Sequence, residues 1–161
     1  VTRKITSGLA KLYYNKIKYI YLGNLNAKRD WGHAKDYVFC QWQMLQQKKP
    51  KDFIISSGKN YSIRQFIEIC CKKIGINIIW SGKRLNEVGK ISPNSQILKK
   101  NKIFLPNQII IKVHKDFYRP SEVNELLGDY SYANKNLKWV PKKSLSDLCD
   151  DMMNHDLNLE S

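Results

Sequence analysis

The sequence predicts an α/β fold, and three observations support this prediction. An apolar run at residues 53–55, an amphipathic stretch at 62–74 and a second apolar run at 76–80 follow one another in strand–helix–strand order. Two Ser-x-x-Gln/Asp patterns, at Ser62 and Ser144, are typical of helix amino termini. With 42% apolar residues in 161, the chain can build a core of its own. These features indicate helices layered against a sheet.

The remaining elements are predicted by the same periodicities. Apolar residues at every third or fourth position predict helices, and short apolar runs bounded by Gly, Asn or Pro predict strands. Residues 81–107 carry turn signals without a steady period, so they are expected to be irregular. In chain order the expected elements are a helix over 2–17, a strand over 19–22, a helix from His33 to Lys49, a buried strand over 53–55, a helix over 62–74, a strand over 76–80, a strand over 109–113, a short helix over 122–127 and a final helix from Ser144.

Cysteine usage and apolar run lengths limit the class of protein. Cys40, Cys70, Cys71 and Cys149 form no CxxC pair, and adjacent cysteines are poorly spaced for a metal, so we expect reduced thiols, no metal site and a cytoplasmic location. No apolar stretch approaches the roughly 18 residues that a membrane helix needs. The residues after Val1 also lack the apolar segment of a signal peptide.

The formal net charge of +14 admits nucleic acid, an anionic membrane or a phosphate-bearing small molecule as partner. The 23 lysines are dispersed over every segment, and they outnumber the five arginines. A nucleic-acid site more often concentrates arginines and stacking aromatics in one stripe. The composition therefore favours a solvated lysine surface, with no nucleic-acid or membrane partner, although a basic binding module stays open as an alternative.

The motifs of a complete oxidoreductase site do not occur in this chain. There is no GxGxxG loop for a dinucleotide and no Walker A lysine. Tyr14 and Lys18 have the Tyr-x-x-x-Lys spacing, but they stand where a predicted helix runs into a strand. The histidines, His33, His114 and His155, are far apart and have no nucleophile beside them. No residue of this chain is assigned a catalytic role.

One loop carries a specific resemblance to a known family. Residues 22–38 read LGNLNAKRDWGHAKDYV and resemble, nearly letter for letter, a segment of GDP-mannose 4,6-dehydratases. Four more stretches resemble the family in the same order along the chain. They are VTRKI at 1–5, LNEVG at 85–89, YRPSEV at 118–123 and NLKWVP at 136–141. The resemblance covers nearly the whole chain, except for about 90–108, which looks like an insertion.

The resemblance implies a fold and a division of labour. The family belongs to the extended short-chain dehydrogenases, so the fold implied is their carboxyl-terminal substrate-binding domain with the last strand and helix of an NAD(P)-binding Rossmann fold. Residues 1–161 would form the sugar-nucleotide-binding region, with about 33–58 as the end of the Rossmann domain. NADP and the catalytic residues would belong to an amino-terminal half, and the isolated chain is expected to be inactive. Family members act as dimers or tetramers, which implies a homo-oligomer.

The same resemblance implies a binding site for GDP-mannose. It assigns Arg29 and Arg119 to the diphosphate, Glu122 to the ribose, Gly23 and Asn24 to the guanine pocket, and Lys4 to a place beside the nucleotide. Elementary chemistry agrees, because guanidinium groups clamp phosphate oxygens with parallel hydrogen bonds. The alternatives left open are another epimerase or dehydratase of the superfamily, and a truncated product without activity.

Overall fold

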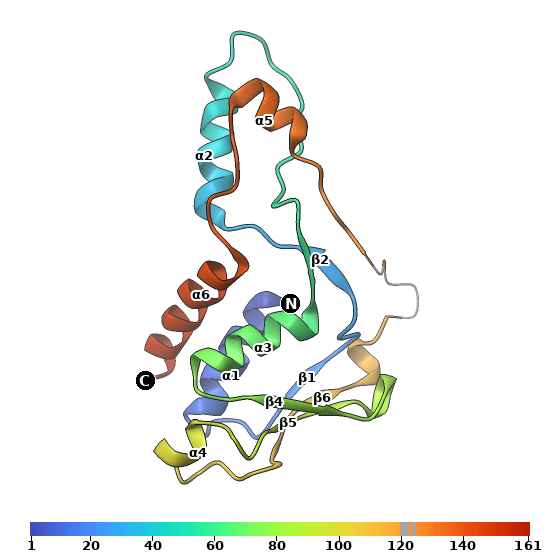
Figure 1. Ribbon diagram of the computed structural model, residues 1–161, viewed down its shortest axis with the longest axis vertical. Coiled ribbons are helices and arrows are strands. Elements are labelled where there is room, and N and C mark those ends of the chain that lie inside the picture. Colours follow the sequence, from blue (N-terminus) through green and yellow to red (C-terminus); the bar gives the residue numbers. More distant parts are fainter. Residues whose placement is uncertain (120–122, 124) are drawn as a thin grey trace.

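The computed structural model describes residues 1–119, 123 and 125–161 and shows a mixed sheet covered by helices (Figure 1). Four strands follow the order β1-β6-β5-β4, in which β1 and β6 are parallel and the other neighbours are antiparallel. The predicted α/β class is therefore confirmed. The strands are β1 (Ile20–Leu22), β4 (Ile78–Ser81), β5 (Val88–Ile91) and β6 (Ile109–Val113).

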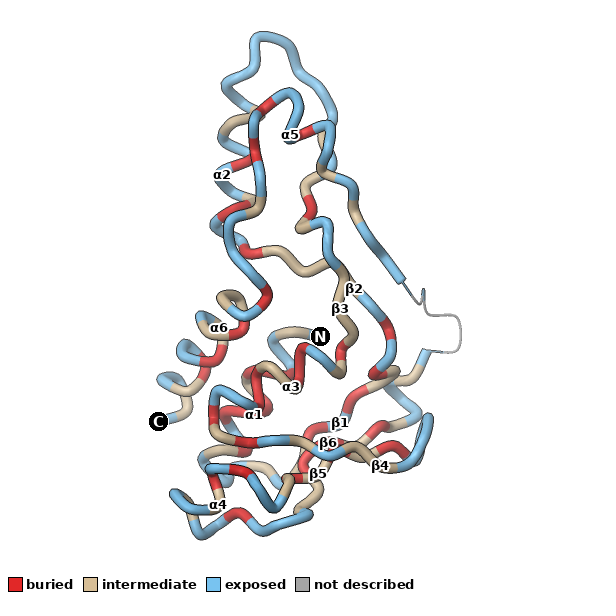
Figure 2. Tube along the Cα trace, in the orientation of Figure 1, coloured by how far each residue is buried: buried red, intermediate tan, exposed pale blue. Residues whose placement is uncertain are grey.

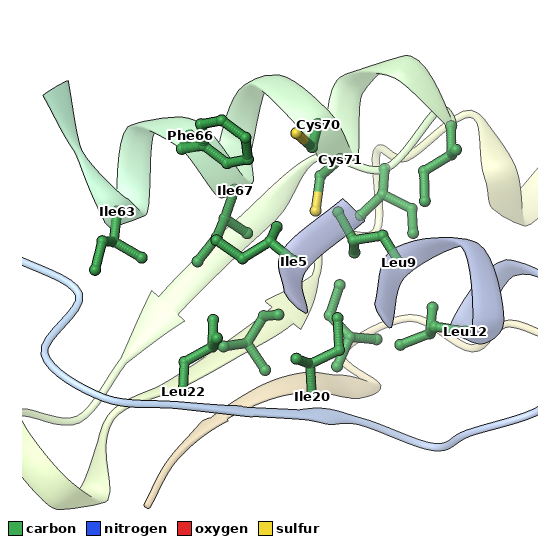
Figure 3. Close-up of a cluster of buried hydrophobic side chains, with 14 of the residues drawn as sticks. Ile5, Leu9, Leu12, Ile20, Leu22, Ile63, Phe66, Ile67, Cys70 and Cys71 are labelled. Carbon is green, nitrogen blue, oxygen red and sulfur yellow. The ribbon is translucent and has the colours of Figure 1, made fainter. Parts of the chain in front are cut away.

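Two helices lie over one face of this sheet and enclose the main core with it (Figure 3), and a third helix packs against both of them. They are α1 (Thr2–Tyr13), α3 (Ile63–Lys73) and α6 (Leu145–Glu160). Ile20 and Leu22 of β1 are buried against the helices, whereas Tyr21 between them faces away, as the alternation of a strand requires. The largest fully buried side chain is Phe66 of α3. The core thus lies where the amphipathic patterns predicted it.

Local signals set the helix ends. Ser62 and Gln65 form a complete capping box at the start of α3, and Gly75 adopts φ +75° just after its end. Helix α1 is shorter than predicted, because Asn15 turns the chain with φ +57° before Ile17. Ser144 and Asp147 form the second capping box, at the start of α6.

The capping carboxylate of α6 gives a pH-dependent stability. Bonds from the Ser144 side chain and backbone hold the pKa of the Asp147 carboxyl below its ordinary value of 3.8. A lowered folded-state pKa contributes stability above the ordinary value, and this is lost as the pH falls through the folded value. We expect Asp147→Asn to melt at a lower temperature than the parent at pH 7, with the difference closing below pH 3.8. Thermal melts of both proteins over a range of pH check this prediction, with Asp52→Asn as the control. A melting-temperature difference between Asp147→Asn and the parent that persists in acid would contradict it.

Two helices form an arm away from the sheet (Figure 1). Helix α2 (Ala34–Leu45) packs against α5 (Ser131–Leu137) around a second cluster of Cys40, Ala133, Leu137 and Trp139. The helical spacing of Val38, Trp42 and Leu45 correctly predicts α2, but these side chains do not form a buried face. They are 62%, 56% and 82% exposed, and Phe39 stacks on Trp42 at the surface with ring centroids 5.9 Å apart. The turn beyond α2 is exposed as well (Figure 2).

Several further predictions need correction. Residues 53–55 form no strand, and Ile54 is 61% exposed, because no strand lies beside them to take up their backbone groups. The segment 81–107 is not irregular throughout, since it contains η1 (Arg84–Asn86), the interior strand β5 and α4 (Ile97–Lys100). The helix predicted at 122–127 lies partly outside the described residues, and its described part is not helical. Whether 90–108 is an insertion stays a prediction.

The cysteines are free and buried, as predicted. Burial raises the pKa of the Cys71 thiol to about 12, so it remains protonated at neutral pH. Within the described ranges, no cluster of His, Cys, Asp and Glu is suited to a metal ion. In the same part of the chain, no helix combines the length and apolar character needed to cross a membrane.

Candidate functional site

Five of the six predicted binding residues line a single cavity of about 460 Å³. They come from four separate segments of the chain, and the other lining residues are mostly apolar. Glu122, the sixth, lies outside the described residues. Arg29 and Arg119, 90 positions apart in sequence, therefore face one cavity and not opposite sides of the molecule. The lining consists of Lys4 from α1, Gly23 and Asn24 after β1, Arg29 from β2 and Arg119 after η2, with Val1, Leu22, Ile63 and Phe117.

Gly23 is required by a close approach of two backbones. A Cβ atom added there would lie 1.9 Å from the carbonyl oxygen of Phe117, at the end of η2 (Lys115–Phe117). A hydrogen bond of 2.9 Å from the His114 N–H to the Leu22 carbonyl holds the same two segments together. A side chain at position 23 would push them apart, so the glycine fixes this wall of the cavity.

Arg29 is positioned by a small ladder that the sequence did not predict. Strand β2 (Lys28–Asp30) pairs antiparallel with β3 (Asn60–Ser62). The Arg29 Nη1 atom donates to the carbonyl oxygens of Lys28 and Val123, both at 2.7 Å. These two hydrogen bonds help to fix the plane of the guanidinium group.

Asp30 fixes the same strand from its other side. Its carboxylate accepts hydrogen bonds from the N–H groups of Ser57 at 2.8 Å, Gly58 at 3.0 Å and Gly128 at 3.4 Å. The sequence alone left open a simple surface ion pair between Arg29 and Asp30. The geometry instead gives Asp30 a structural role, in which it gathers two distant segments beside β2.

Lys4 and Phe117 form one contact of the cavity wall. The Lys4 Nζ atom lies 3.1 Å from the centroid of the Phe117 ring, and burial lowers the pKa of this ammonium group. Phe117 was missed by sequence reasoning, because a single exposed aromatic in a short turn has no periodicity. Its only signal was its place just before the Tyr-Arg-Pro stretch.

The charge of the cavity indicates an anionic ligand. Three lining side chains, Lys4, Arg29 and Arg119, are cationic, and none of the described lining residues is acidic. Asn24 Oδ1 accepts from the Asn26 N–H at 3.0 Å, which shapes the turn between them. Two guanidinium groups and an ammonium group around one space suit phosphate oxygens, and the apolar lining residues suit a flat ring.

For two neighbours of this loop the sequence predicts structural roles, in which His33 caps or packs and Asp36 bonds backbone groups near the loop. His33 caps α2 by accepting from the Lys35 N–H at 3.2 Å, and its Nε2 lies 3.0 Å from Asp151 Oδ2. Asp36 accepts from the N–H groups of Lys142 at 2.9 Å and Lys143 at 2.8 Å. Its partners lie more than 100 residues away and not near the loop as expected, so Asp36 ties α2 to the segment before α6.

Comparison with known proteins connects this geometry with one family. The profile of the family described as GDP-mannose 4,6 dehydratase matches residues 1–152. The chain is 42% identical over 159 residues to GDP-mannose 4,6 dehydratase of Drosophila melanogaster, covering 99% of this chain and 37% of that protein. It is 45% identical over 157 residues to GDP-mannose 4,6-dehydratase of Vibrio cholerae serotype O1, covering 98% and 42%.

Solved structures share the fold at low identity. RMD from Pseudomonas aeruginosa, complexed with NADPH, superposes with a TM-score of 0.69 at 12% identity and covers 98% of this chain and 42% of that one. UDP-glucose-4-epimerase from Stenotrophomonas maltophila gives 0.65 at 12% identity, with 96% and 40% covered. The chain thus spans about two fifths of the length of the relatives it matches. On the family match over residues 1–152, the chain belongs to the GDP-mannose 4,6 dehydratase family.

Proposed function

We propose that this chain is the sugar-nucleotide-binding portion of a GDP-mannose 4,6-dehydratase, a lyase that converts GDP-mannose to GDP-4-keto-6-deoxymannose. The observation that carries the proposal is the convergence of Arg29 and Arg119, from separate loops, on one cavity beside Lys4. A diphosphate needs several fixed cationic donors, and these three side chains supply them without an acidic residue in the described lining.

Each lining residue has a role in this proposal. Arg29 and Arg119 hold the diphosphate with charge-assisted hydrogen bonds, and Lys4 lies beside the nucleotide. Gly23 and Asn24 border the guanine, and Gly23 keeps this wall in place through its close contact with the Phe117 backbone. Glu122 accepts from the ribose hydroxyls; this assignment rests on the family resemblance alone.

The residues of this chain do not fit the NADP that the reaction requires. A dinucleotide site needs a glycine-rich turn between a parallel strand and a helix. The sequence has no GxGxxG, and in the described sheet only β1 and β6 are parallel. We therefore assign NADP and the catalytic residues to a separate dinucleotide-binding portion, and we expect the 161-residue chain alone to bind GDP-sugar weakly at best and not to turn it over.

The exposed face of α2 fits this division of labour. Val38, Phe39, Trp42 and Leu45 present an apolar surface to water, and exposed patches of this kind commonly mark interaction sites. We propose that this face, within residues 33–58 as the end of a Rossmann domain, packs against the rest of that domain. We also propose that the complete protein assembles as a homodimer or a homotetramer. Its proposed location is cytoplasmic, which is consistent with the four free thiols.

Calorimetric titration of the chain with nucleotides tests the proposed ligand. We expect GDP and GDP-mannose to bind with similar affinity, because the diphosphate and base carry most contacts. UDP-glucose and a dTDP-sugar should bind at least ~10-fold more weakly, a difference of about 1.4 kcal/mol. Equal affinity for all three bases would favour another nucleotide-sugar enzyme of the superfamily.

The net charge of +14 supports a competing hypothesis, in which the chain is a nucleic-acid-binding module. Titration with a single-stranded oligonucleotide at two salt concentrations separates the two. Weak oligonucleotide binding that GDP does not affect is expected. If the chain binds the oligonucleotide tightly, loses that binding steeply as the salt concentration rises and does not bind GDP, nucleic-acid binding would replace the proposed function.

A further inference from the structure

A second cavity, of about 250 Å³, lies on the arm side of the β2–β3 ladder and shares no lining residue with the first. The segments around it are the end of β2, residues 57–61, Tyr130 and the approach to α6. The lining side chains used in the argument are Trp31, Lys59, Tyr61, Tyr130, Lys142 and Lys143. The nucleotide proposal does not use this space, although Trp31 and Pro141 belong to two of the family motifs.

The charged residues of the cavity lining that the structure describes are all cationic. The described lining holds Lys59, Lys142 and Lys143 and no acidic side chain. None of the three lysines forms an ion pair with a described residue. The carboxylates around the cavity are already engaged. Asp36 accepts from the backbone N–H groups of Lys142 and Lys143, Asp147 bonds Ser144, and Asp151 bonds His33. Because no acidic side chain of the described residues lines the cavity or pairs with its lysines, the three ammonium groups can meet an anion.

Aromatic rings also line the cavity, and two of them are held in place. The Trp31 ring packs on Phe66 with centroids 5.1 Å apart, and the Tyr130 ring meets Trp139 edge-on at 5.8 Å. A Cβ atom at Gly58, where φ is +70°, would lie 2.7 Å from the Tyr130 ring, so the glycine allows this ring to lie where it does. Fixed rings offer a ligand a flat apolar surface at little entropic cost.

We propose that this cavity binds a phosphate monoester carried on a small ring, of the size of a sugar monophosphate. The lysines would meet the phosphate, and the rings would cover the apolar face of its carrier. The volume, below the roughly 300–1,000 Å³ typical of sites for larger ligands, excludes a complete nucleotide sugar. The site is separate from the cavity that holds Arg29 and Arg119, so it exists whether or not that cavity binds GDP.

The experiment titrates the 161-residue chain with glucose 6-phosphate and follows amide and indole signals by ¹H–¹⁵N NMR. The indole of Trp31 and the amides of Ser57 and Tyr130 should shift, also in the presence of saturating GDP. Replacing Lys59, Lys142 and Lys143 together by Gln should weaken binding at least ~10-fold, and the fold should persist because the Lys142 and Lys143 backbone amides still bond Asp36. The matched control replaces Lys99, Lys100 and Lys102 by Gln and removes the same charge elsewhere.

Four outcomes decide the proposal. The proposal is supported if glucose 6-phosphate binding is lost in the variant of Lys59, Lys142 and Lys143 and is kept in the control variant. Equal loss in both shows only a general charge effect and overturns it. Inorganic phosphate that binds as tightly as glucose 6-phosphate removes the role of the rings. Signals of Lys4, Asn24 or Arg29 that shift instead assign the ligand to the first cavity and overturn a second site.

Discussion

Replacing Arg29 and Arg119 together by alanine should reduce the affinity for GDP by at least ~100-fold. Each hydrogen bond to a charged group contributes about 1.5–3 kcal/mol, so two guanidinium groups on one diphosphate account for about 3–6 kcal/mol. Calorimetric titration of GDP into both proteins measures the difference. The variant with Arg29→Lys and Arg119→Lys should have a GDP affinity between those of the parent and the alanine variant, because an ammonium group keeps the charge but not the planar fork.

The control for this experiment removes two cations from a turn outside both cavities. Lys83→Gln with Arg84→Asn leaves η1 intact, because Arg84 has φ +54° and Asn tolerates that region. Its GDP affinity should equal that of the parent, and melting temperatures should show that all variants fold. Parent-like GDP binding by the alanine variant would mean that the cavity of Arg29 and Arg119 is not the nucleotide site.

The largest stability effect is expected at Phe66, where truncation to alanine should cost about 3–5 kcal/mol of unfolding free energy. Phe66 is fully buried on α3, where it packs beneath Trp31 and among the side chains of Figure 3. Removing the ring leaves a cavity that neighbouring helices cannot fill without moving. Equilibrium urea unfolding measures the change.

A matched phenylalanine on the surface provides the comparison. Phe39 on α2 is 48% exposed, so Phe39→Ala should change the unfolding free energy by no more than about 0.5 kcal/mol. Phe66→Leu should lose less than the alanine variant, since most of the volume stays. Equal losses at Phe39 and Phe66 would contradict the placement of the core.

The helices that sequence predicted well are those with local signals. The Ser62 and Ser144 capping boxes and the apolar faces of α1, α3 and α6 involve residues three or four apart, so the pattern contains the whole interaction. The apolar pattern of α2 correctly predicted a helix. It did not predict the exposure of Trp42 and Leu45, because periodicity states which residues share a face and not what covers it.

The strands that sequence missed depend on distant partners. Strand β5 contains Gly89 and Lys90, has a register shift between them, and forms because β4 and β6 lie on either side. Strands β2 and β3 are polar, and the pairing of Arg29 with Tyr61 joins residues 32 positions apart. The apolar run at 53–55 shows the reverse case, in which a strand-like composition forms no strand because no neighbouring strand pairs with it.

The convergence of site residues was predicted by the family motifs and could not be predicted from periodicity or composition. Arg29 and Arg119 have no periodicity between them, and only the resemblance of both loops to one family predicted that they meet. Phe117 and the Gly23 contact required coordinates, because a backbone approach between residues about 90 positions apart leaves no trace in either local sequence.

The three backbone amides that Asp30 holds have a consequence for how this protein can vary. Asp30 stands between Arg29, which faces the first cavity, and Trp31, which faces the second. The stretches carrying Ser57 and Gly128 are clamped to this one carboxylate. A substitution at that position would disturb both pockets and the arm at once. Natural variation among close relatives should therefore spare Asp30, whereas exposed lysines outside both pockets can vary.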